Sequence, residues 1–164
     1  MESIIERQKQ LEKLPDYDTV RRSKKRFYDK QFPPTFESIF SSKQSNFEWN
    51  EKKQHYKQNR KQYERCVGWI RLTELFPIYE LRVVDNLSPR DIRQGHIGNC
   101  YFMSFLGAIV NQWPEQIEKM FTTKNVNFTG YYQIQLKING HYTTMVVDDF
   151  VPYDKETNQL IYAK

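Results

Sequence analysis

The apolar and polar positions divide the chain into two parts of different character. Residues 1–65 are dominated by charged and amide side chains, whereas residues 66–164 contain the longest apolar run and the regular strand patterns. A run of apolar residues needs a core to cover it, and a polar segment does not. We therefore predict a polar N-terminal extension with helices, followed by one globular unit.

The longest apolar run lies between Asn99 and Gln112 and ends before Pro114. Its apolar residues occupy almost every position, so the predicted helix has no polar face. A helix of this kind is normally buried, and we expect it to form the centre of the globular unit. A second, amphipathic helix is predicted from Pro114 to Phe121.

The last third of the chain changes to a pattern in which every second residue is apolar. Ile134, Leu136 and Ile138 would share one face of a strand. Asn139–Gly140 is a strong hairpin signal because both residues tolerate positive φ, and a returning strand is predicted over residues 141–149. The sequence therefore predicts an α/β fold of the α+β type, with a buried central helix packed on a small antiparallel sheet.

Residues 48–66 form another helix-compatible stretch, which is too polar to be a core helix. Its large apolar residues, Trp49, Tyr56 and Tyr63, are seven residues apart and would form a narrow stripe along the helix. Such a helix either docks on its own domain or places its aromatic stripe on a partner. The sequence leaves both alternatives open.

Charge is concentrated in the N-terminal part. The chain has a net charge of +5, and residues 1–65 hold 16 Lys and Arg against 10 Asp and Glu. The densest run comprises Arg21, Arg22, Lys24, Lys25 and Arg26. A block of like charges indicates an acidic partner, although a solvated linker has the same composition. No aromatic RNA-binding signature or zinc-finger spacing accompanies the block, so nucleic acid is not the expected partner.

The remaining composition indicates the expected compartment. No apolar run approaches the roughly 20 residues that cross a bilayer, and the charged N-terminus does not resemble a signal peptide. The two cysteines, Cys66 and Cys100, have neither metal-ligand spacing nor a disulfide pattern. We therefore expect a reducing, cytoplasmic environment and no membrane span.

One of the two cysteines stands in the stretch QGHIGNCYFMSF, directly before the apolar run. A buried structural thiol is one interpretation. The other is a nucleophile, because the first turn of a helix favours the negative charge of a thiolate. In that case the Cys100 N–H and the Gln94 amide could stabilise the oxyanion formed by attack on a carbonyl carbon. Gly95 and Gly98 would let the intervening turn fold tightly.

This stretch and three flanking segments resemble the calpains, calcium-dependent cysteine proteases with a papain-like core. DIRQGHIGNCY resembles the family's nucleophile motif, and the three other segments follow the family order along the chain. These segments are Phe27-Tyr28-Asp29 with Phe32-Pro33, Trp69-Ile70-Arg71 with Glu74, and Met145-Val146-Val147-Asp148-Asp149-Phe150-Val151-Pro152. The resemblance covers residues 25–163 and implies the first subdomain of a papain-like protease core.

The resemblance also implies roles for individual residues. Cys100 would be the nucleophile and Gln94 the oxyanion donor. Asp91 would bind calcium together with the backbone carbonyls of Val84 and Asn86. Calcium takes about six to eight oxygen ligands, and the family's next acidic ligand lies beyond this sequence, so we expect an incomplete site.

A cysteine protease also needs an imidazole that takes the thiol proton. In calpains the histidine and the asparagine come from the second half of the protease core, and this chain ends where that half would begin. None of His55, His96 and His141 has the family's placement.

The sequence therefore predicts a pseudoenzyme: a non-catalytic structural or interaction protein that binds an acidic partner. From charge, we expect that partner to be a microtubule or another cytoskeletal surface, in the cytoplasm or a cilium. The alternative is the N-terminal part of an active calcium-dependent cysteine endopeptidase whose second half is missing from this chain.

Overall fold

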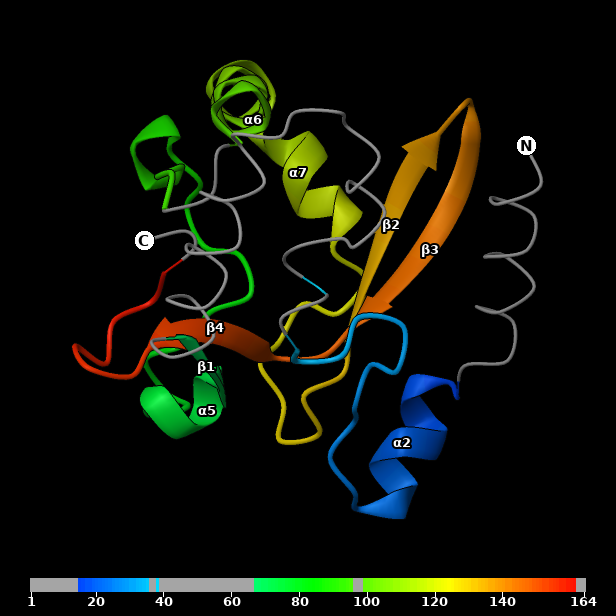
Figure 1. Cartoon of the computed structure of the whole chain (residues 1–164). Helices are drawn as coiled ribbons and strands as arrows, with labels where there is room; N and C mark the ends of the chain where they lie inside the picture. The colour runs from blue at the N-terminus through cyan, green and yellow to red at the C-terminus, as the bar shows by residue number, and fades with distance from the viewer. Residues whose placement is uncertain (1–14, 36–37, 39–66, 96–98, 162–164) are drawn as a thin grey trace, which may run out of the picture.

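The computed structural model describes residues 15–35, 38, 67–95 and 99–161 (Figure 1). The predicted aromatic stripe of Trp49, Tyr56 and Tyr63 lies outside these residues, and so does most of the predicted extension. The described residues form short helices and two small sheets. The elements are α2 (Tyr17–Ser23), β1 (Val67–Arg71), α5 (Leu72–Leu75), η2 (Pro89–Asp91), α6 (Cys100–Gln112), α7 (Pro114–Met120), β2 (Tyr132–Ile138), β3 (His141–Val147) and β4 (Phe150–Asp154).

The predicted hairpin is confirmed. β2 and β3 pair antiparallel, with Ile138 opposite His141 at the turn. The turn residues Asn139 and Gly140 have φ values of 50° and 84°, as a two-residue hairpin turn requires. The polar side chains Gln135 and Lys137 are exposed, whereas the apolar side chains of Ile134, Leu136 and Ile138 are partly covered. Local alternation and turn chemistry were therefore sufficient to define this element.

The second sheet joins distant parts of the chain. β1 pairs antiparallel with β4, from Val67 opposite Asp154 to Arg71 opposite Phe150. A Cβ at Gly68 would lie 2.5 Å from a ring carbon of Tyr153, so a larger residue there would displace that ring. The sequence analysis did not predict this pairing.

A small core lies where α2 meets the β2–β3 hairpin. Val20 of α2 and Phe27 pack with Tyr131 and Val146, and Tyr17 lies against this cluster. The Phe27 and Tyr131 rings meet edge to face, with centroids 5.0 Å apart. Residues that precede position 65 therefore contribute to the same core as the C-terminal strands.

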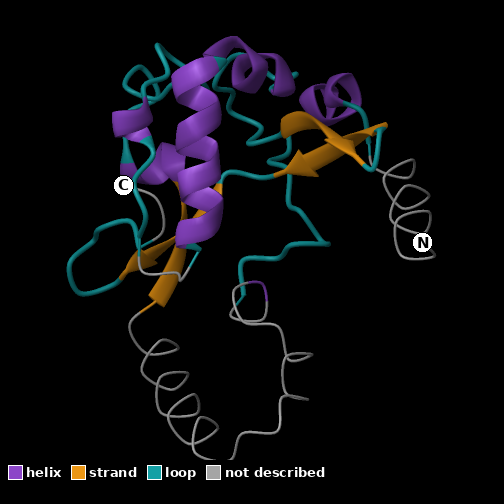
Figure 2. Cartoon of the chain, turned by 90° about the horizontal axis from the view of Figure 1, so that it is seen from above, coloured by secondary structure: helices purple, strands orange, loops and turns teal. Residues whose placement is uncertain are grey.

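The prediction that the central apolar helix is buried was wrong. α6 is present, but Val110 is its only buried residue, and Met103, Leu106 and Gly107 on the same side are partly covered. Among the named elements, its main contacts are with α7 and η2. In Figure 2, α6 runs along one side of the described part, away from the β2–β3 hairpin.

The opposite side of α6 carries large apolar residues in the open. Tyr101 is 78% exposed, Phe105 62% and Phe102 49%. We call Tyr101, Phe102 and Phe105 the outer face of α6. The helix is apolar on both sides, but the described residues cover only one of them, which is the physical reason for the failed prediction.

Candidate functional site

Cys100 is the first residue of α6. The carbonyl of Asn99 accepts hydrogen bonds from the N–H groups of Phe102 (2.9 Å) and Met103 (3.1 Å), which closes the first turn. The Asn99 side chain makes no capping bond, and its Oδ1 atom is buried without a partner among the described residues. Cys100 is exposed and its thiol is free, so the sulfur lies at an accessible helix N-terminus.

Asp91 and Gln94, the other two residues of the nucleophile motif with a predicted role, precede this helix. Asp91 ends η2, and its Oδ2 atom accepts from the Ser88 N–H at 2.9 Å in a capping box. Gln94 follows and is exposed. Residues 96–98, which connect Gln94 with Cys100, lie outside the described residues. The oxyanion role of Gln94 therefore stays a prediction.

The described residues supply only part of the calcium site implied by the resemblance, so the calcium role of Asp91 stays a prediction. They contain no group of three or more His, Cys, Asp or Glu side chains placed to hold a metal ion. One oxygen of Asp91 already accepts from Ser88. A single exposed carboxylate is far short of the ligand number that calcium takes.

Only one of the three histidines can be placed. His141 is exposed at the first position of β3, at the tip of the hairpin. Figures 1 and 2 both show this tip well away from α6. His55 and His96 lie outside the described residues. Within the described part of the chain, no imidazole is placed to take the proton of the Cys100 thiol.

The basic run on and after α2 is presented to solvent. Its five cationic side chains are all exposed. Arg26 forms a 2.7 Å ion pair with Glu74, and none of the other four pairs with a described acidic residue. Asp16 caps the helix by accepting from the Thr19 N–H at 2.8 Å, and Val20 anchors the helix in the core. The packing of Val20 therefore fixes how α2 lies on the core. The four other cations of the run, Arg21, Arg22, Lys24 and Lys25, are free of salt bridges to described residues and could bind a partner.

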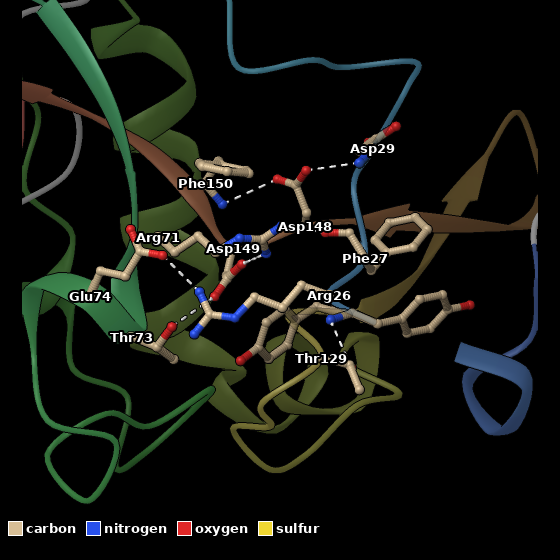
Figure 3. Close-up of polar contacts among 12 residues, drawn as sticks. Arg26, Phe27, Asp29, Arg71, Thr73, Glu74, Thr129, Asp148, Asp149 and Phe150 are labelled. Carbon is tan, nitrogen blue, oxygen red and sulfur yellow. Dashed lines mark hydrogen bonds and ion pairs between the residues drawn. The ribbon is translucent and has the colours of Figure 1, made fainter. Parts of the chain in front are cut away.

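The sequence analysis missed a buried polar cluster in which three of the motif segments meet (Figure 3). Arg71 of β1 and Asp149, which precedes β4, form a buried ion pair. The second guanidinium nitrogen donates to the Phe27 carbonyl at 2.6 Å. The guanidinium also lies 4.2 Å from the centre of the Phe150 ring. Arg71 thus links the N-terminal segment, β1 and the turn before β4.

Main-chain bonds complete the same cluster. The Phe27 N–H donates to the Thr129 carbonyl at 2.6 Å, and the Leu72 N–H to the Asp149 carbonyl at 3.1 Å. Asp148 accepts from the Asp29 N–H at 2.8 Å. These contacts indicate that three of the four motif segments hold the fold together, whereas the fourth carries the thiol.

Asp148 gives the cluster a pH dependence. Burial raises the pKa of its carboxyl above the ordinary value, against the lowering effect of the Asp29 and Phe150 N–H groups. The folded protein therefore binds this proton more tightly than the unfolded chain does. The contribution of Asp148 to stability is fully present below the ordinary pKa and is lost as pH rises through the folded-state pKa.

The Asp148→Asn variant tests this sign. The free energy of unfolding of the natural chain, minus that of Asp148→Asn, should decrease as the pH rises from about 3 to about 7. Urea unfolding at a series of pH values measures this difference. A difference that increases with pH would show that hydrogen bonding to the carboxylate, not burial, dominates at this position.

Comparison with known proteins agrees with the motif resemblance. The family model for calpain family cysteine proteases matches residues 27–164. Calpain-5 of Caenorhabditis elegans is 25% identical over 160 residues, which are 91% of this chain and 21% of that protein. The calpain-type cysteine protease DEK1 of Arabidopsis thaliana is 26% identical over 158 residues, 92% of this chain and 7% of that protein. ADL1, a calpain-type cysteine protease of Oryza sativa, is 23% identical over 156 residues.

The match covers most of this chain but little of its relatives. The chain spans about a fifth of Calpain-5 and less than a tenth of the two plant proteins.

In the described part, no helix has both the length and the apolar character needed to cross a bilayer. The mixed helices and small antiparallel sheets agree with an α+β protease core. The chain belongs to the calpain family of cysteine proteases and contains part of the family's protease core.

Proposed function

We propose that this chain is the nucleophile half of a calpain-type cysteine endopeptidase core, and that it hydrolyses peptides only when a second polypeptide surface covers α6. The observation that carries the proposal is the position of the thiol. Cys100 is exposed at the N-terminus of a helix whose outer face is apolar and uncovered. Such a face is unfavourable in water and suits a protein interface.

The covering surface would supply the base that the described residues lack. In the reaction, an imidazole takes the proton of the Cys100 thiol while the sulfur attacks the peptide carbonyl carbon. The oxygen then becomes negatively charged, and the Cys100 N–H and the Gln94 amide would donate to it. The imidazole returns the proton to the departing amine, and an acyl-thioester remains. Water releases the peptide acid from this thioester and regenerates the thiol.

Burial of the outer face of α6 would also favour the attack of the Cys100 sulfur on the carbonyl carbon. Exclusion of water from the thiol strengthens the electrostatic interactions that stabilise the oxyanion. Tyr101 and Phe105 lie one helical turn apart, close to Cys100 in sequence, so one surface could cover both of them and the thiol. The names of the relatives, calpain-type cysteine proteases, support the same reaction class.

A second candidate function is the interaction-only role expected from the sequence. The observation in its favour is the set of four exposed cations on and after α2 that form no salt bridge with a described residue. In this case the outer face of α6 would bind a partner without an imidazole, and the thiol would stay inactive. An acidic cytoskeletal surface is the partner that we propose for this role.

Reaction with a peptidyl epoxide, which alkylates activated cysteines, distinguishes the two candidates. We would compare the purified recombinant chain with the same protein isolated, with its bound partners, from its source cells. For the endopeptidase half, we expect no peptide turnover by the recombinant chain, and both turnover and alkylation of Cys100 in the cell-derived material. Each assay would be run with calcium and with a chelator.

The outcomes are separable. Turnover by the recombinant chain alone would show that this sequence contains its own base and would overturn the requirement for a second surface. Cell-derived protein without turnover or Cys100 alkylation would reject the endopeptidase role and leave the interaction role. The variant Phe105→Ser should lose the partner, whereas Gln112→Ser, an exposed polar position on the same helix, should keep it.

A further inference from the structure

One edge of the β2–β3 hairpin makes no main-chain hydrogen bond to another described segment. In an antiparallel pair, the main-chain groups of alternate residues bond to the neighbouring strand, and those between them point away from it. The two-residue turn closes at Ile138 and His141, and the pairing continues to the end of the hairpin without a bulge. The N–H and C=O groups of Tyr142 and Thr144 therefore point away from β2.

The two edges of this sheet differ. At the outer edge of β2, the Gln133 carbonyl accepts from the Thr122 N–H (2.9 Å) and the Thr123 N–H (3.3 Å). The Gln133 N–H in turn donates to Thr123 Oγ1 at 3.0 Å. At the outer edge of β3, no described residue bonds to the main chain of Tyr142 or Thr144. Figure 1 shows the turn end of the β2–β3 hairpin projecting from the rest of the described part.

β3 also lacks the features that usually prevent edge pairing. Its seven residues, HYTTMVV, include no proline and no Lys, Arg, Asp or Glu. Natural sheets protect open edges with charges, prolines or bulges. An unprotected edge of this kind can accept an extended polypeptide, whose main chain continues the sheet. Tyr142, which is 70% exposed, would lie beside the added strand.

The basic helix α2 lies beside the same strand. Val20 of α2 and Val146 of β3 belong to one core cluster. Arg21 and Arg22 follow Val20 directly and are exposed without an ion pair to a described residue. On the other strand, the Lys137 ammonium lies 5.8 Å from the centre of the Tyr142 ring. A strand added to β3 would therefore lie near positive charges, which favour acidic residues in it.

We propose that the β3 edge and α2 together bind an extended acidic polypeptide segment, by addition of a strand to β3 and by ion pairs with Arg21 and Arg22. A protein partner is favoured over nucleic acid or an anionic membrane because only a polypeptide offers main-chain N–H and C=O groups in the spacing of a strand. The site does not involve Cys100 or α6, so it would act as a docking site separate from the proposed chemistry.

The probe is a nine-residue peptide of alternating valine and threonine, flanked by two glutamates at each end. Fluorescence anisotropy would measure its binding to the full chain at low and at physiological salt. Two matched peptides carry N-methyl groups on the odd or on the even residues. Only one alternate set of N–H groups can face β3, so one methylated peptide should bind at least about tenfold more weakly and the other should be little affected.

Protein variants test the charged half of the site. Arg21→Glu/Arg22→Glu should weaken peptide binding at least about tenfold at low salt. Arg90→Glu/Lys119→Glu, on η2 and α7, changes the net charge by the same amount and should leave binding within about twofold. Thermal unfolding would confirm that both variants fold.

Three results would overturn the proposal. The first is absence of binding by the unmethylated peptide. The second is equal binding by all three peptides, which would exclude strand addition. The third is binding of a single-stranded DNA 20-mer, or of vesicles with phosphatidylserine, at least as tight as that of the peptide. That outcome would identify a general polyanion surface instead.

Discussion

Replacing Asp149 with alanine is expected to lower the free energy of unfolding by about 3–5 kcal/mol, because the substitution leaves a buried guanidinium without its carboxylate. Arg71 and Asp149 are both only 5% exposed. In the variant, Arg71 would keep its bond to the Phe27 carbonyl and its contact with the Phe150 ring. Neither of these interactions neutralises a charge. Urea unfolding followed by circular dichroism measures the loss.

Two comparisons show whether burial causes the effect. Glu74→Ala removes the exposed ion pair with Arg26 and should cost less than about 1 kcal/mol. The double variant Arg71→Met/Asp149→Leu removes both buried charges and should be more stable than Asp149→Ala. Equal losses in Asp149→Ala and Glu74→Ala would contradict the assignment of a buried ion pair.

The buried pair also explains why one glycine is required. Gly130 has φ of +66°, a conformation that other residues rarely adopt. A Cβ at this position would lie 2.4 Å from Asp149 Oδ1 and 2.5 Å from Arg71 Nη1. The ion pair thus approaches the backbone at a point where no side chain fits. The sequence around Gly130 carries no local signal of this requirement.

The sequence predicted the elements that depend on neighbours along the chain. The β2–β3 hairpin follows from alternation and from Asn139–Gly140, which act over a few residues. The sheet of β1 and β4 does not, because Arg71 pairs with Phe150 across most of the globular part. The motif resemblance identified the segments that contain Arg71 and Phe150 separately, without indicating that they pair. Only the structure shows that Arg71 joins them.

The failed prediction for α6 has a similar origin. An apolar pattern shows which surface is unfavourable in water, but it does not show what covers that surface. The predicted helix is present and Cys100 is its first residue. The prediction assumed that one side of the helix would meet the sheet, whereas Tyr101 and Phe105 are exposed. In our proposal the partner of this face also brings the imidazole.

Substitution of the nucleophile and substitution of the oxyanion donor should affect peptide hydrolysis differently when the second surface is bound. In cell-derived material, Cys100→Ala should lower kcat/KM for peptide hydrolysis by at least about 10⁴-fold, because no other group can form the acyl intermediate. Cys66→Ala replaces the only other cysteine and should leave hydrolysis unchanged. Loss of activity in both variants would point to a structural effect of thiol replacement.

Gln94→Ala should lower kcat by about 10²–10³-fold and change KM little, because the amide would bind the charged oxygen only after attack. The sulfur would still attack, so alkylation of Cys100 by a small reagent such as iodoacetamide should be nearly unchanged. That difference separates a donor to the oxyanion from a residue that positions the thiol. If Gln94→Ala slowed hydrolysis and alkylation equally, Gln94 would act by shaping the turn before α6. The oxyanion would then depend on the Cys100 N–H and on groups supplied by the second surface.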